Sequence, residues 1–141
     1  AEGVFRHKTS ELGISHLLFC QSAGCSGIRA GEPAARTAQK VAKKHGYNLE
    51  SHLSKAIDPT GGGQFDLIIA VDTYNLLELR EILPSDQHDK LHLLLDFSKD
   101  YKGQSIPDPY GKPRAAFENS LKLIENGVDG LINHLRLQHK I

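Results

Sequence analysis

The sequence has 141 residues, of which 39% are hydrophobic, and it carries 17 Lys and Arg residues against 17 Asp and Glu residues. This length fits one domain with a single core, and the hydrophobic fraction is too high for a disordered chain. The net charge of zero gives no global attraction to nucleic acid or an anionic membrane, and no apolar run approaches the roughly 20 residues that span a bilayer. We therefore expect one domain over residues 1–141, in the cytoplasm, with reduced thiols and no nucleic-acid or membrane partner.

The first predicted element is a helix over residues 1–12, because its apolar residues fall near helical spacing and Gly13 supplies a stop. The sequence contains no Met, and it opens on Ala1 inside this helix. We expect either that an initiator Met has been removed or that a segment in front of the helix is absent.

A short apolar run, HLLFC at residues 16–20, precedes the Gly- and Ser-rich stretch 22–31, which predicts a buried strand leading into a loop. A helix is favoured over residues 33–45, since Pro33 suits its first turn and Gly46 suits its C-cap. The basic residues late in this helix are explained by its dipole: Lys40, Lys43, Lys44 and His45.

The strongest signal for a buried strand is FDLIIAV at residues 65–71. A helix is predicted to follow over residues 73–83, with Asp72 as its N-cap and Pro84 at its end. The pattern then repeats in LHLLL at residues 91–95, which predicts a third strand.

A long connection rich in Gly, Ser, Pro and Asp occupies residues 96–113, and apolar residues in helical rhythm predict a closing helix over residues 115–137. We expect Gly127 and Gly130 to weaken this helix. Three buried strands that alternate with helices predict an α/β layer architecture with a parallel sheet.

In such folds the chemistry lies in loops beyond the carboxyl ends of the strands. The first of these loops follows Cys20 and contains Cys25 and Arg29, which suggests a phosphate-binding loop. A cysteine phosphatase loop needs Cys-x5-Arg, because that spacing wraps backbone N–H groups and a guanidinium around one phosphate. Ser26 and Gly31 stand where the arginine would have to be. We therefore interpret the cysteines as a buried strand residue and a small loop residue.

The second candidate for chemistry is Asp108, which lies between Pro107 and Pro109. A loop bounded by prolines can hold a carboxyl group over a pocket as a general acid, and the alternative is an ordinary Asp-Pro turn. His88 and His92 have the spacing of metal ligands on a helix, but the predicted strand would separate them. We interpret these histidines as part of a solvated turn.

Short segments follow one another in a recognisable order: AEGVFRH at residues 1–7, SAG at 22–24, GEP at 31–33, FDLIIAVD at 65–72, NL at 75–76, and DPY at 108–110. In order and spacing they resemble the low-molecular-weight protein tyrosine phosphatases over nearly the whole chain. Each motif alone is weak, and their combination carries the resemblance.

The resemblance implies a three-layer α/β/α fold with a flavodoxin-like parallel sheet, and hydrolysis of phosphotyrosine or aryl phosphates through a cysteinyl-phosphate, without a metal or other cofactor. It makes Asp108 the counterpart of the general acid and Tyr110 a wall of the phosphotyrosine pocket. Ile28 falls where the family places an aromatic rim residue, and Ser22 is expected to bind substrate. The implied partner is a phosphotyrosine protein or a small aryl phosphate, and a homodimer stays open.

Three positions depart from the family pattern. Ile28 is less able than an aromatic residue to stack on a phenyl ring, Gly111 stands in place of a second Tyr, and residues 35–37, Ala-Arg-Thr, replace Asp-Pro-Arg. We therefore expect a different choice of substrate and different support of the loop.

The largest departure is at the front, where the family has a first strand and a Cys-x5-Arg loop immediately before the helix that opens on AEG. That strand is central in the family's sheet, between the segments at 16–20 and 67–71, so we expect two sheet edges to lack a partner. The leading hypothesis is a phosphatase domain whose parent protein hydrolyses phosphotyrosine, while these 141 residues lack the nucleophile.

Three alternatives remain open at this stage. The departures at Ile28, Ala35 and Gly111 favour a pseudophosphatase that acts as a binding or regulatory module. An arsenate reductase shares the fold, but it needs a redox pair of cysteines, and no Cys follows Cys25. An unrelated flavodoxin-like domain that binds a ligand would need a nucleotide fingerprint, which the sequence does not contain.

Overall fold

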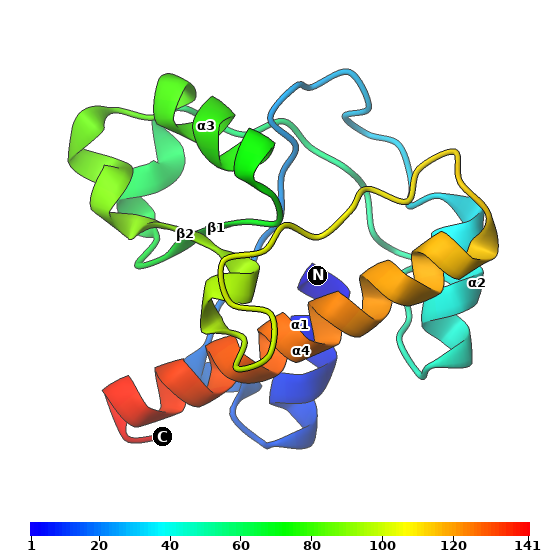
Figure 1. Ribbon diagram of the computed structural model, residues 1–141. Helices are drawn as coiled ribbons and strands as arrows, with labels where there is room; N and C mark the ends of the chain where they lie inside the picture. Colours follow the sequence, from blue (N-terminus) through cyan, green and yellow to red (C-terminus); the bar gives the residue numbers. More distant parts are fainter.

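A computed structural model describes all residues from 1 to 141. Its longest element is the C-terminal helix α4 (Arg114–His139), and both α1 (Glu2–Glu11) and α2 (Arg36–Lys44) pack against it (Figure 1). The main hydrophobic core lies between these helices and the segment that follows the sheet. Its most buried members include Val4, Val41, Leu94, Leu95 and Val128.

A small parallel sheet forms the other part of the molecule. Strand β1 (Ile68–Ala70) pairs with β2 (Leu91–Leu93), with Ile68 opposite Leu91 and Ala70 opposite Leu93. Helix α3 (Thr73–Ile82) connects the two strands and packs on both. A second, smaller core holds this unit together through Ala70, Leu79, Leu83, Leu91 and Leu93.

The predicted helices are confirmed, although their first and last residues differ from the predicted ones. Asp72 caps α3 as expected, since its Oδ1 accepts the N–H of Asn75 at 2.7 Å. Helix α2 begins at Arg36 rather than at residue 33, because Ala35 has extended backbone angles and serves as the N-cap. No helix is both long and apolar enough to cross a bilayer.

The predicted strand over residues 16–20 is wrong. Residues Ser15–Leu17 form a short 3-10 turn, and the chain after Leu18 is extended without joining a ladder. Leu17 and Phe19 are 53% and 72% exposed, so the apolar run is not covered on both faces as a buried strand would be. β1 correspondingly has a partner on one side only.

The predicted strand over residues 91–95 is also shorter than expected. It ends at Leu93, and the 3-10 turn η4 (Leu94–Phe97) takes the next residues into the main core. An apolar segment that forms a buried turn has the same composition as a buried strand. The hydrophobic pattern of the sequence therefore does not distinguish a turn from a strand.

The glycines of α4 do not interrupt it. The helix runs unbroken from residue 114 to 139, and the turn η4 lies directly against it. A Cβ atom on Gly130 would lie 1.8 Å from the backbone oxygen of Phe97, and one on Gly127 would lie 2.7 Å from Leu94 Cγ. η4 thus approaches the helix closely at both glycines, through its backbone at Gly130 and mainly through the side chains of Leu94 and Leu95 at Gly127.

Candidate active site

The loop that carries Asp108 is attached to the carboxyl end of β1. The N–H of Ile106 donates to the carbonyl of Val71 at 2.9 Å, and the Ile106 side chain is buried in the main core. The N–H of Thr73 donates to Ser105 Oγ at 2.9 Å, which ties the same loop to the start of α3. The loop therefore lies where parallel α/β folds place their chemistry.

The other side of this loop is fixed to α4. Ser120 Oγ, on a buried residue, donates to the carbonyl of Pro107 at 2.8 Å. Asp108 itself is exposed, and its Oδ1 accepts the N–H of Tyr110 at 3.0 Å. Since Pro107 and Pro109 also restrict the backbone, the carboxyl group is held in place with its second oxygen free of protein hydrogen bonds.

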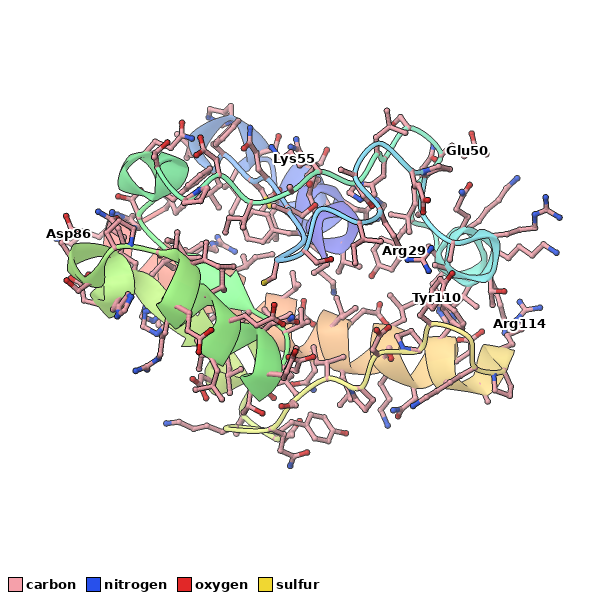
Figure 2. The ribbon with its side chains drawn as sticks, turned by 90° about the horizontal axis from the view of Figure 1, so that it is seen from above. Arg29, Glu50, Lys55, Asp86, Tyr110 and Arg114 are labelled. Carbon is pink, nitrogen blue, oxygen red and sulfur yellow. The ribbon has the colours of Figure 1, made fainter.

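Tyr110 is where two distant loops meet. The guanidinium carbon of Arg29 lies 4.2 Å from the centre of the Tyr110 ring, and Arg29 also pairs with Glu32 at 3.3 Å (Figure 2). The neighbouring Ile28 is 86% exposed, and Tyr110 is 55% exposed. The structure thus brings the loop 22–31 to the Asp108 loop, with an aromatic face and an isoleucine open to solvent.

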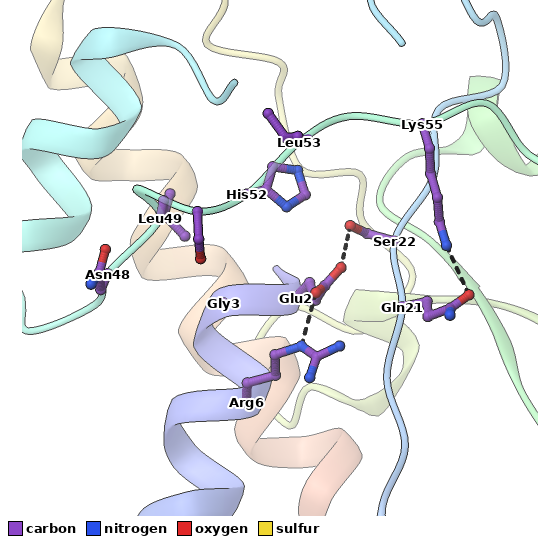
Figure 3. A pocket seen from close by; sticks show the side chains of 11 residues that line it. Glu2, Gly3, Arg6, Gln21, Ser22, Asn48, Leu49, His52, Leu53 and Lys55 are labelled. Carbon is purple, nitrogen blue, oxygen red and sulfur yellow. Dashed lines mark hydrogen bonds and ion pairs between the residues drawn. The ribbon is translucent and has the colours of Figure 1, made fainter. Parts of the chain in front are cut away.

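Ser22 lies at a different place, beside the first turn of α1. Its Oγ donates to Glu2 Oε1 at 2.6 Å, while Arg6 Nε donates to Glu2 Oε2 at 2.8 Å (Figure 3). Burial alone would raise the pKa of Glu2, but these hydrogen bonds hold that pKa below its ordinary value. Ser22 makes no hydrogen bond to Asp108 or Tyr110, so the four predicted site residues do not form one contact cluster.

A polar hollow of about 410 Å³ opens beside Ser22. Besides Glu2 and Arg6 it is lined by His52 and Lys55, and Lys55 Nζ donates to Gln21 Oε1 at 2.8 Å (Figure 3). Glu2, Arg6 and Lys55 are thus hydrogen-bonded to other side chains of the hollow, which positions them but leaves few free groups for a ligand.

The two cysteines are free and half-buried. Burial is the main cause that raises the pKa of both thiols, and Glu2 adds to the effect at Cys20. A raised pKa keeps a thiol protonated at neutral pH and makes it a poor nucleophile. The raised pKa values agree with the absence of a Cys-x5-Arg motif at either cysteine. Cys20, however, lies in extended chain and not in the predicted strand.

The two histidines considered as metal ligands make other contacts. His88 Nε2 hydrogen-bonds the carbonyl of Leu83 at 2.9 Å, and His92 packs edge-on against Phe97. No group of three or more His, Cys, Asp or Glu side chains is placed to hold a metal ion.

Sequence reasoning missed two residues of this region. For Arg29 the sequence suggests only a place in a phosphate-binding loop, and nothing local predicts that it stacks on Tyr110, which lies 81 residues away in the chain. Glu2 is the second residue; an acidic side chain in the first turn is explained by the helix dipole, and nothing local predicts its bond to Ser22.

Comparison with known proteins identifies the fold. The family model described as "Low molecular weight phosphotyrosine protein phosphatase" matches residues 1–140. A low molecular weight protein-tyrosine-phosphatase of Streptomyces coelicolor is 33% identical over 141 residues, covering 98% of this chain and 85% of the relative.

Solved structures agree with this result. A protein tyrosine phosphatase from Entamoeba histolytica, with Hepes in its active site, superposes with a TM-score of 0.89 at 27% identity, covering 99% of this chain and 87% of the other. YfkJ from Bacillus subtilis gives a TM-score of 0.89 at 26% identity, covering 97% and 85%. The fold is therefore flavodoxin-like α/β, and the chain belongs to the low molecular weight protein-tyrosine-phosphatase family.

Proposed function

We propose that this chain belongs to an enzyme that hydrolyses phosphotyrosine or aryl phosphate monoesters, with Asp108 as the general acid. The observation that carries the proposal is the attachment of the Asp108 loop both to the carboxyl end of β1 and to α4. A general acid must be positioned before its pKa matters, and this loop supplies the position.

The proposed reaction has two steps. A cysteine thiolate attacks phosphorus, so that an S–P bond forms while the P–O bond to the aryl group breaks, and the Asp108 carboxyl group donates its proton to the departing oxygen. In the second step the Asp108 carboxylate accepts a proton from water, whose oxygen attacks phosphorus and releases the thiolate and inorganic phosphate.

The other predicted residues shape the pocket. We propose that Tyr110 forms a wall against the phenyl ring, with Ile28 at the rim, because both are exposed and Arg29 joins their loops. Ser22, which lies beside α1, would bind substrate through its hydroxyl, the group that donates to Glu2 in this structure. An isoleucine rim stacks less well on a flat ring than an aromatic residue would.

The nucleophile is the component that these 141 residues do not supply. Neither cysteine has an arginine six residues later, and both thiols have raised pKa values. We therefore propose that a polypeptide of residues 1–141 alone does not turn over substrate.

The test compares two proteins with p-nitrophenyl phosphate: the full-length product of the gene and the polypeptide of residues 1–141. We expect turnover from the first and none from the second. Turnover by residues 1–141 at the full-length rate would contradict the proposal, because Cys20 or Cys25 would then be the nucleophile.

A second candidate is a pseudophosphatase that binds phosphotyrosine proteins in the cytoplasm. The departures from the family pattern at Ile28, Ala35 and Gly111 favour it, and Ile28 leaves the rim without an aromatic side chain. Binding of a phosphotyrosine peptide by the full-length product without any turnover would support this candidate, and robust turnover would exclude it.

A further inference from the structure

The charges of this neutral chain are distributed unevenly. Residues 33–49 contain four Lys or Arg residues and no carboxylate, whereas residues 72–89 contain five carboxylates and one Arg. The first segment includes α2, and the second includes α3. The cationic segment is therefore a local feature that the zero net charge conceals.

Three cations of α2 form a row on one face of the helix. Arg36, Lys40 and Lys43 are at positions i, i+4 and i+7, and all three are exposed. Val41 and Ala42 are buried and attach the helix to the core. We call the three cations the α2 row.

The α2 row borders a hollow of about 360 Å³. The other wall of this hollow is the turn after the helix, residues 46–50, where Glu50 is the only acidic group. The hollow is thus a recess with three cations and one anion around it.

Nothing in the structure neutralises the α2 row. Arg36, Lys40 and Lys43 make no ion pair and donate no side-chain hydrogen bond, whereas nearby Lys44 and His45 pair with Glu118 at 3.3 and 2.6 Å. The helix dipole favours Lys43 near the C-terminus, but it disfavours Arg36 in the first turn. Like charges one turn apart also repel, so the dipole explains only part of the row.

The row lies near the candidate active site. Figure 2 shows Arg29, Tyr110 and Arg114 at the end of the molecule occupied by α2, while Asp86 lies at the opposite end. In the hollow beside Ser22, by contrast, Arg6 and Lys55 are already hydrogen-bonded to Glu2 and Gln21. The α2 row is the stronger candidate for an anionic partner because its charges are free.

We propose that the α2 row binds an extended acidic peptide segment of a partner protein. Side chains one turn apart on a helix are separated by about 5–6 Å, and alternate side chains of an extended strand by roughly 6.5 Å. Carboxylates at alternate positions of a peptide therefore match the row, with one of them in the hollow. The apolar face of α2 is buried in the core and has no free anchor for a bilayer, which favours a peptide over a membrane.

The test measures binding of a fluorescent peptide with Glu at alternate positions to the polypeptide of residues 1–141, by anisotropy at low salt. The test variant carries R36E, K40E and K43E together. The matched control carries K99E, K102E and K122E. These substitutions change the net charge by the same amount, at exposed lysines that make no ion pair. Thermal unfolding of both variants checks that they remain folded.

We expect the test variant to weaken binding roughly tenfold and the control by less than about twofold, with added salt weakening the wild type. Equal weakening by both variants would overturn the proposal, because only net charge would then matter. Equal binding of a neutral Ser peptide, or stronger binding to phosphatidylserine vesicles than to the peptide, would also overturn it. None of these results depends on hydrolysis, so the proposed phosphatase function is tested separately.

Discussion

At the scale of single residues, Gly130 marks the closest approach between α4 and η4. A Cβ atom there would lie 1.8 Å from the backbone oxygen of Phe97, which cannot rotate away as a side chain could. We expect Gly130→Ala to lower the free energy of unfolding by about 1–3 kcal/mol or more in chemical denaturation. Gly63→Ala is the control, because a Cβ atom meets nothing within 4 Å there. Wild-type stability of Gly130→Ala would show that the two elements can separate freely.

Tyr47 is a second residue whose role is local and testable. Its buried ring carries a hydroxyl that donates to Glu125 Oε2 at 2.6 Å, and burial followed by Glu125 raises the pKa of this phenol. Because the acceptor is charged, we expect Tyr47→Phe to destabilise the protein by about 1.5–3 kcal/mol. The exposed Tyr74 supplies the control variant Tyr74→Phe. An equal effect of the two substitutions would show that the hydrogen bond contributes nothing.

At the scale of elements, Glu118 of α4 pairs with Lys44 of α2 at 3.3 Å and with His45, at the end of α2, at 2.6 Å. The hydrogen bond from His45 is the main cause that lowers the pKa of Glu118, with Lys44 acting in the same direction. A carboxyl group with a lowered pKa contributes stability above its unfolded-state pKa, and this contribution is lost as the pH falls through the folded-state pKa.

We therefore expect Glu118→Gln to be less stable than the wild type at neutral pH, with the difference vanishing in acid. Denaturant titrations of both proteins from neutral pH down to about 3 measure this change. A difference that stays constant over this range would show that the carboxylate charge is not what joins the helices.

The elements were predicted unequally well from the sequence. Helix α3 is predicted by its N-cap at Asp72, and α4 by a long series of apolar residues at helical spacing. Both signals are local in the sequence. The run at residues 16–20 has the composition of a strand, but a strand needs a neighbour to pair with, which composition does not reveal. The structure leaves Phe19 exposed there.

Only part of the candidate site could be predicted, because contacts between distant parts of the chain are not visible in the sequence. The Asp108 loop could be found from its prolines, but its anchors at Val71 and Ser120 come from distant parts of the chain. The stacking of Arg29 on Tyr110 is likewise a product of the tertiary fold. Residue type and spacing indicated Asp108 as the proposed acid, and only the structure shows what holds its loop.

At the scale of the whole molecule, the family and the flavodoxin-like fold are established, and the central proposal is that Asp108 protonates the leaving group. The most direct measurement compares Asp108→Asn with the wild type in the full-length product, using phenyl phosphate and dinitrophenyl phosphate. Phenolate is a poor leaving group that needs a proton, whereas dinitrophenolate departs without one. Asp86→Asn, at the opposite end of the molecule, is the control (Figure 2).

We predict that Asp108→Asn lowers kcat/KM for phenyl phosphate by roughly 10²- to 10⁴-fold and changes kcat/KM for dinitrophenyl phosphate far less, while Asp86→Asn changes neither. The ratio kcat/KM is compared because it reports the departure of the leaving group and not the later hydrolysis step, which both substrates share. An equal loss on both substrates, or no loss on phenyl phosphate, would contradict the assignment of Asp108 as the general acid.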